Sequence, residues 1–97
     1  VYLVLKGPGT IVAAPDGRCM RNPTGNCGMA KGGSGDVLVG MLVSLLGLGL
    51  APMDACCAAV WLHGRAGDLA AREVGLWGMT PSDLLDRIPA ALREVTE

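Results

Sequence analysis

The segment Asn26-Cys27-Gly28-Met29-Ala30-Lys31-Gly32-Gly33-Ser34-Gly35-Asp36 decides the fold. It leads directly into a long apolar stretch that begins at Val37. It is not a Walker A loop, because no Gly-Lys-Ser/Thr follows the glycines. It is not a Rossmann fingerprint either, because Leu38 stands where the third glycine would be needed. What remains is a glycine-rich loop that opens a helix.

Such a loop is suited to bind an anion. Backbone without side chains approaches a ligand closely, and the N–H groups of residues 32–35 add to the unpaired N–H groups of the helix start. Phosphate is the natural occupant of this positive helix end. Asp36 would repel a phosphate, so it suits better as the base that deprotonates an attacking hydroxyl. An acid here also stabilises the helix by about 0.3–1 kcal/mol, and local physics leaves both roles open.

The residues before this loop have the pattern of strands. Residues 1–6 form a short apolar run that predicts a buried strand. Residues 10–14 predict a second strand, and Pro15-Asp16-Gly17 is a turn in which glycine takes the positive-φ position. Residues 18–21 then return. We therefore expect a hairpin over residues 10–21.

The residues after the loop have the pattern of helices. The first is predicted over roughly 35–48, and a second begins near Pro52, which suits a first helical turn. A third is predicted from Thr80, which is followed by a proline and an acid, with Pro89 expected to kink or restart it. Strands followed by helices indicate an α/β fold.

Two polar positions lie on the second predicted helix. Asp68 and Arg72 are four residues apart, and this spacing predicts an ion pair on its outer face. His63 stands in an apolar stripe, which favours a packing role over catalysis.

The composition limits the possible functions. The chain has 97 residues, of which 51% are hydrophobic, with a net charge of −1. That charge gives no attraction to nucleic acid. The length allows at most one domain and supplies too few strands for a doubly wound sheet, so the fold is expected to be incomplete on its own.

Residues 37–51 are almost wholly apolar, but about 15 residues are fewer than the ~20 that cross a bilayer. We expect no membrane span, and with no signal peptide visible a cytoplasmic location. The cysteines form no C-x-x-C pair, so they are expected to be reduced, buried and without a metal. They are Cys19, Cys27, Cys56 and Cys57.

Several motifs together resemble a known family. Gly33-Ser34-Gly35-Asp36 resembles the Gly-x-Gly-Asp signature of ribokinase-like enzymes, and residues 28–38 narrow the resemblance to the NAD(P)H-hydrate dehydratases. Leu5-Lys6-Gly7-Pro8-Gly9-Thr10 is similar to the upstream nucleotide loop of that family. Residues 63–68 and 80–84 resemble its later helices. The resemblance covers essentially all 97 residues in the family's order.

The resemblance implies a fold as well. Residues 1–97 would be the C-terminal segment of one ribokinase-like domain with three layers, contributing short strands, a hairpin and three helices. The N-terminal half of the same domain would supply most of the parallel sheet. Lys31 departs from the family pattern, in which a small hydroxyl residue is usual.

The resemblance also implies a reaction and its residues. The family repairs hydrated NAD(P)H, using ATP or ADP to phosphorylate the hydrate hydroxyl and then eliminating phosphate, a lyase activity. Asp36 would contact the substrate and act as the catalytic base. Mg²⁺ is expected, although no ligand for it is recognisable in this segment. The implied nucleotide-binding residues are Lys6, Gly7, Pro8, Gly9, Thr10, Asn26, Gly32, Gly33, Ser34 and Gly35.

Three alternatives stay open from the sequence. The chain could belong to a ribokinase-like kinase of a small vitamin-precursor alcohol, or be an inactive nucleotide-binding fragment. A membrane hairpin through residues 37–62 is the third. The sequence leaves the oligomeric state open, a homo-oligomer included.

Overall fold

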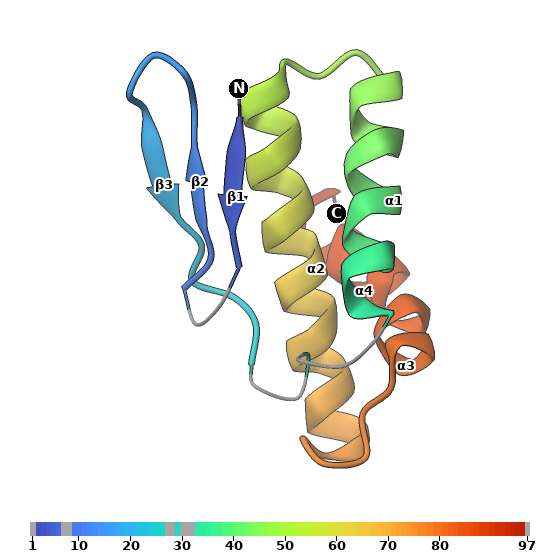
Figure 1. The fold of residues 1–97 in the computed structure, drawn as a ribbon. Helices are drawn as coiled ribbons and strands as arrows, with labels where there is room; N and C mark the ends of the chain where they lie inside the picture. Colours follow the sequence, from blue (N-terminus) through green and yellow to red (C-terminus); the bar gives the residue numbers. More distant parts are fainter. Residues whose placement is uncertain (1, 7–8, 27–28, 30–32, 97) are drawn as a thin grey trace.

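A computed structural model describes residues 2–6, 9–26, 29 and 33–96 of the chain. A three-stranded antiparallel sheet stands against two long helices, with two short helices beside them (Figure 1). The α/β class predicted from the sequence is confirmed. Among the described residues, no helix combines the length and apolarity needed to cross a bilayer.

The sheet has the order β1-β2-β3, with β1 Leu3–Leu5, β2 Ile11–Ala13 and β3 Cys19–Arg21. Val4 pairs with Val12, and Val12 pairs with Met20. The predicted hairpin over residues 10–21 is therefore confirmed, and Gly17 takes the expected positive φ of 93°. The prediction that the first strand is buried is wrong for this structure, because Leu3 and Leu5 are exposed.

Helix α1 spans Ser34–Gly47 and helix α2 spans Pro52–Val74, close to their predicted bounds. They run side by side in opposite directions (Figure 1). Pro52 is tolerated at the start of α2 because its missing N–H would have no helical partner there.

The third predicted helix is divided in two. Helix α3 spans Pro81–Asp86 and helix α4 spans Ile88–Thr96, with Arg87 between them. Thr80 caps α3 in a capping box with Asp83. Pro89 cannot donate the hydrogen bond that a continuous helix would need at this point, so the helix restarts at Ile88.

Two apolar clusters hold these elements together. The first lies between β2, α1 and α2, and the second between α2, α3 and α4. Full burial of a Val or Leu side chain contributes about 1.5–3 kcal/mol. Their buried members are Val12, Ala14, Leu38, Met53, Cys56, Ala59 and Val60 in the first, and Leu62, Ala66, Leu84 and Ala91 in the second.

The methionine, tryptophan and cysteine side chains differ in their burial. Met53 is buried and Met41 packs against both clusters. Trp61 packs on the second cluster, whereas Trp77 is 93% exposed. Cys56 is buried, but Cys19 lies exposed on β3, so the expectation that it is buried is wrong.

Candidate functional site

The first turn of helix α1 begins at a glycine that no other residue could easily replace. Gly33 is the N-cap with φ 98°, a left-handed conformation that side chains disfavour. A Cβ there would also lie 3.1 Å from the Pro81 ring of α3. No side chain caps this helix end, and Asp36 is the acidic residue of the first turn. The helix start therefore presents backbone N–H groups beside a carboxylate.

Lys6 lies next to this helix start. It follows β1, and a Cβ added to Gly35 would stand 3.5 Å from its Nζ. Strand β1 thus brings an ammonium group to the positive end of helix α1. Two sources of positive potential at one point attract a phosphate group.

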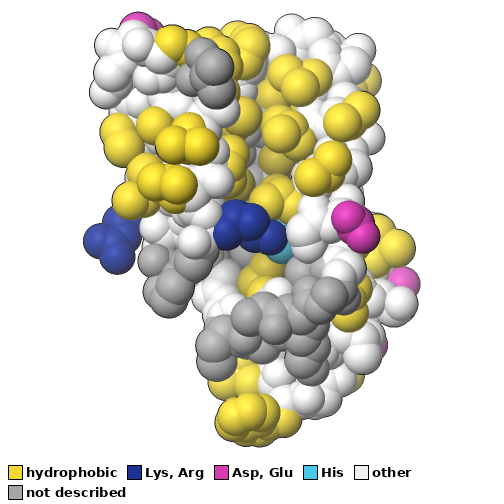
Figure 2. Space-filling model, viewed as in Figure 1, with side chains coloured by type: hydrophobic (Ala, Val, Ile, Leu, Met, Phe, Trp, Pro, Cys, Tyr) yellow, Lys and Arg dark blue, Asp and Glu magenta, His cyan; other side chains and the backbone are white. Residues whose placement is uncertain are grey.

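The larger cavity, of about 830 Å³, lies beside Lys6 between the sheet and α2. Figure 2 shows basic side chains bordering a hollow on this face, below a region where apolar side chains gather. Its lining is mainly loop backbone and small side chains. It comprises Lys6, Gly9, Thr10, Arg21, Asn22, Pro23, Thr24, Gly25, Asn26, Met29, Leu38, Val60, His63 and Gly64.

A smaller cavity, of about 310 Å³, is also lined by Lys6. Gly35 and Asp36 line it, together with Cys56 of α2. Lys6, Leu38 and Val60 line both cavities, so the two adjoin. A molecule that filled the larger cavity and reached past Lys6 would meet the Asp36 carboxylate in the smaller one.

The predicted site residues are thereby divided between two adjoining cavities. Lys6, Gly9, Thr10 and Asn26 line the larger cavity, while Gly35 and Asp36 line the smaller one. Gly33 opens helix α1, and Ser34 is its first residue. The predictions for Gly7, Pro8 and Gly32, and the departure at Lys31, lie outside the described residues.

The structure adds residues that the motifs did not indicate. The Arg21 side chain lies over Gly9, where an added Cβ would be 2.9 Å from Nη2, and it lines the larger cavity. His63 and Asn22 are buried and also line it. For His63, the only indication of a place near the site was the resemblance of residues 63–68 to a helix of the family. Nothing in the local pattern marked Arg21 or Asn22.

The thiol of Cys56 and the arrangement of possible metal ligands can be assessed among the described residues of the site. Burial raises the pKa of the Cys56 thiol, which keeps it protonated and a poor nucleophile at neutral pH. Across the described ranges, no three His, Cys, Asp or Glu residues lie close enough together to hold a metal ion.

Comparison with known sequences identifies the family. The sequence profile of the NAD(P)H-hydrate dehydratases matches residues 1–90. The chain belongs to the NAD(P)H-hydrate dehydratase family. The resemblance seen in the motifs is thus confirmed.

Individual members of the NAD(P)H-hydrate dehydratase family are similar over most of the chain. The bifunctional NAD(P)H-hydrate repair enzyme Nnr of Thermofilum pendens is 51% identical over 96 residues, 99% of this chain and 18% of that protein. The ADP-dependent (S)-NAD(P)H-hydrate dehydratase of Bacillus subtilis is 42% identical over 87 residues, 90% of this chain and 32% of that protein.

A solved structure of the same family confirms the fold. The crystal structure of the ADP/ATP-dependent NAD(P)H-hydrate dehydratase from Bacillus subtilis, co-crystallised with ATP/Mg²⁺, superposes with a TM-score of 0.91 at 39% identity. The match covers 97% of this chain and 34% of the crystallised chain. The chain therefore spans about a third or less of the length of these relatives.

Proposed function

We propose that this chain supplies nucleotide-binding and catalytic residues of an ATP- or ADP-dependent NAD(P)H-hydrate dehydratase. One observation carries the proposal: Lys6, the amide end of helix α1 and Asp36 meet at the junction of two cavities. Phosphoryl transfer needs a phosphate cradle and a base for the attacking hydroxyl, and this junction offers both.

Each group has a distinct part in the proposed reaction. The backbone N–H groups around residues 32–35, together with Lys6, hold the transferring phosphoryl group and its developing charge. Asp36 accepts the proton of the hydrate hydroxyl while the hydroxyl oxygen bonds to the terminal phosphorus and the phosphoanhydride bond breaks. The phosphorylated hydrate then loses phosphate and a ring proton, which restores the ring double bond of NAD(P)H.

The nucleotide would occupy the larger cavity. Lys6, Gly9, Thr10 and Asn26 line it, and residues 7–8 connect two of them in sequence. The relative co-crystallised with ATP/Mg²⁺ supports a nucleotide as the co-substrate. Because the described residues offer no cluster of metal ligands, we propose that Mg²⁺ depends on the nucleotide phosphates and on residues outside them.

We further propose that residues 1–97 are the C-terminal segment of one domain, and that the rest of the same polypeptide completes the sheet and the hydrate pocket. The relatives are longer than this chain by a factor of about three or more, which leaves ample length for both. A cytoplasmic location fits a substrate derived from NAD(P)H and belongs to the same proposal.

The test is Asp36→Asn in the complete polypeptide. Turnover of hydrated NADH is expected to fall by about 10²-fold or more, the usual contribution of a positioned base, while ATP or ADP still binds. Asp16→Asn is the matched control, because Asp16 is exposed on the hairpin turn with Arg18. Near-normal turnover by Asp36→Asn would remove Asp36 from the mechanism.

A kinase of a small vitamin-precursor alcohol remains the second candidate for the same site. The family assignment favours the dehydratase, since the matching profile and relatives carry that activity in their names. Incubation of the complete enzyme and ATP with hydrated NADH, or with thiazole and pyrimidine alcohols, separates the two. Phosphorylated alcohol without recovery of NADH would replace the proposal, and neither product would indicate an inactive nucleotide-binding chain.

A further inference from the structure

Residues 22–26 form the wall of the larger cavity that faces helix α2. Two side chains of this wall bond directly to backbone carbonyls of α2. Asn22 donates from Nδ2 to the Val60 oxygen at 3.1 Å, and Thr24 donates from Oγ1 to the Trp61 oxygen at 2.9 Å. The wall is thus attached to the helix near its middle.

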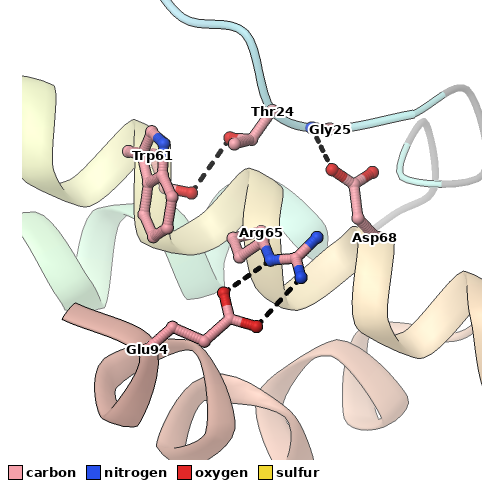
Figure 3. A network of polar contacts seen from close by, with 6 residues as sticks. All are labelled: Thr24, Gly25, Trp61, Arg65, Asp68 and Glu94. Atoms are coloured by element: carbon pink, nitrogen blue, oxygen red, sulfur yellow. Dashed lines mark hydrogen bonds and ion pairs between the residues drawn. The ribbon is translucent and has the colours of Figure 1, made fainter. Parts of the chain in front are cut away.

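Asp68 attaches the far end of the same wall. Its Oδ2 accepts from the Gly25 backbone N–H at 3.0 Å, and its Oδ1 accepts from Asn26 Nδ2 at 2.9 Å. In Figure 3 the Asp68 side chain points from α2 toward Gly25, away from the Arg65–Glu94 pair. The ion pair predicted with Arg72 is not among those of the described part of the chain. Asp68 instead bonds a segment 42 and 43 residues earlier in the sequence.

The chemistry of these contacts requires a carboxylate. A backbone N–H and a side-chain amide NH₂ are both donors, and only an ionised Asp or Glu offers two acceptors without a donor of its own. An Asn at position 68 would place its NH₂ against one of the two donors. Charge-assisted hydrogen bonds of this kind are also the stronger ones.

Two positions of α2 at which the preceding loop approaches the helix closely are glycines. A Cβ on Gly64 would lie 2.8 Å from the Thr24 carbonyl carbon and 2.9 Å from the Gly25 nitrogen. A Cβ on Gly67 would lie 2.8 Å from Met29 Cγ. The wall therefore sits directly on the α2 backbone, and Asp68 fixes its height and direction there.

We infer that Asp68 is a positioning residue for nucleotide binding. It holds Gly25 and Asn26 in place, and both of these residues line the larger cavity together with Lys6. The inference rests on the proposed function in one respect, namely that the larger cavity receives the ATP or ADP. Asp68 itself is not among the residues that line the cavity, so it acts through Asn26.

The experiment measures binding of ATP and of ADP to the complete polypeptide by calorimetry, with steady-state kinetics beside it. Asp68→Asn is expected to raise the nucleotide Kd and KM by about tenfold or more, because one donor of the wall loses its acceptor. Asp68→Glu keeps the charge but moves the oxygens by one methylene, so it should fold and show a smaller rise in Kd. The kcat at saturating nucleotide is expected to change by less than threefold.

Glu94→Gln is the matched control, since it removes another carboxylate that bonds α2, through Arg65, and neither Glu94 nor Arg65 lines the larger cavity. It should lower the melting temperature without changing the nucleotide Kd. Wild-type Kd in folded Asp68→Asn and Asp68→Glu, with a lower melting temperature only, would overturn the inference and leave the proposed function standing. A wild-type enzyme that binds no nucleotide would overturn the proposed function and this inference with it.

Discussion

The ammonium group of Lys6 lies where strand β1 meets the first turn of helix α1, and it borders both cavities. A lysine at a strand end is commonly just solvated. Here the adjoining helix end provides a second positive potential, so an anion between the two is stabilised by both. Lys6 and Asp36 both line the smaller cavity.

Lys6→Met in the complete polypeptide is therefore expected to weaken nucleotide binding by about tenfold or more. The reason is the loss of a hydrogen bond from a charged donor, worth about 1.5–3 kcal/mol. Calorimetric titration with ATP and ADP measures it. Arg18→Met serves as the control, because this substitution also removes a cation, but one that bonds Asp16 on the exposed turn. Equal affinities of the Lys6 variant and wild type would contradict the role.

At the residue scale, the sequence indicates those site residues whose geometry is local. Gly33, Gly35 and Asp36 belong to one helix start, and a glycine-rich run before an apolar helix predicts that feature directly. Arg21 and Asp68 were not indicated, since their roles depend on partners distant in the sequence. Spacing within one helix favoured Arg72 as the partner of Asp68, whereas the fold brings Gly25 and Asn26 to it.

Helix α2 is the element on which the larger cavity is built. It contributes to both apolar clusters and carries the cavity wall on its backbone. Its two glycines meet different neighbours. Gly64 faces the backbone of Thr24 and Gly25, while Gly67 faces the flexible side chain of Met29. The two positions should therefore respond differently to an added methyl group.

Gly64→Ala is expected to destabilise the complete protein by about 1–3 kcal/mol, because backbone cannot move away without shifting the wall. Alanine favours a helix over glycine by about 1 kcal/mol, which offsets only part of this. Gly67→Ala is the paired variant and should cost less, since the Met29 side chain can rotate. Chemical denaturation measures both. A Gly64 variant as stable as the Gly67 variant would show that the wall is not tightly seated.

The helices could be predicted more fully than the strands. Prolines and capping residues mark helix ends locally, so Pro52 and Thr80 gave the starts of α2 and α3. The division at Arg87 follows from Pro89. The predicted strands were too long, and the prediction that β1 is buried was wrong. Burial of a strand face depends on a packing layer that the strand's own sequence does not specify.

The contact between α2 and α4 includes an ion pair that should respond to pH. The hydrogen bond from Arg65 holds the pKa of Glu94 below its ordinary value of 4.5. A carboxylate whose pKa is lowered by folding stabilises the folded state at pH values above its ordinary pKa. That stabilisation is lost as the pH falls through the lowered pKa.

The difference in unfolding free energy between wild type and Glu94→Gln is thus expected to shrink below about pH 4.5. Urea unfolding at pH 7, 5 and 3 measures it, with Glu73→Gln as a comparison because Glu73 pairs with Arg87 instead. A difference that stayed constant across this range would mean that Glu94 titrates alike in the folded and unfolded chain.

At the scale of the whole molecule, apolar side chains remain on the outside of α1 and the sheet. Val39 and Val43 are 59% and 62% exposed, and Leu5 of β1 is 53% exposed. The wholly apolar helix predicted from the sequence thus packs on one side only. Continuous apolar surface of this kind marks an interface. We propose that the rest of the same domain covers it, since the crystallised relative contains this fold within a chain about three times as long.

Val43→Asp tests that assignment in the complete polypeptide. If the remaining sheet covers α1, the new carboxylate is buried without a partner, and a loss of about 3–5 kcal/mol of stability is expected. Val43→Thr has nearly the same shape without the charge, and should cost less. Thermal and urea unfolding measure both variants. Should α1 keep its outer face in water, the two substitutions would have similar and small effects. That outcome would show that no further part of the polypeptide covers α1, whatever its nucleotide affinity.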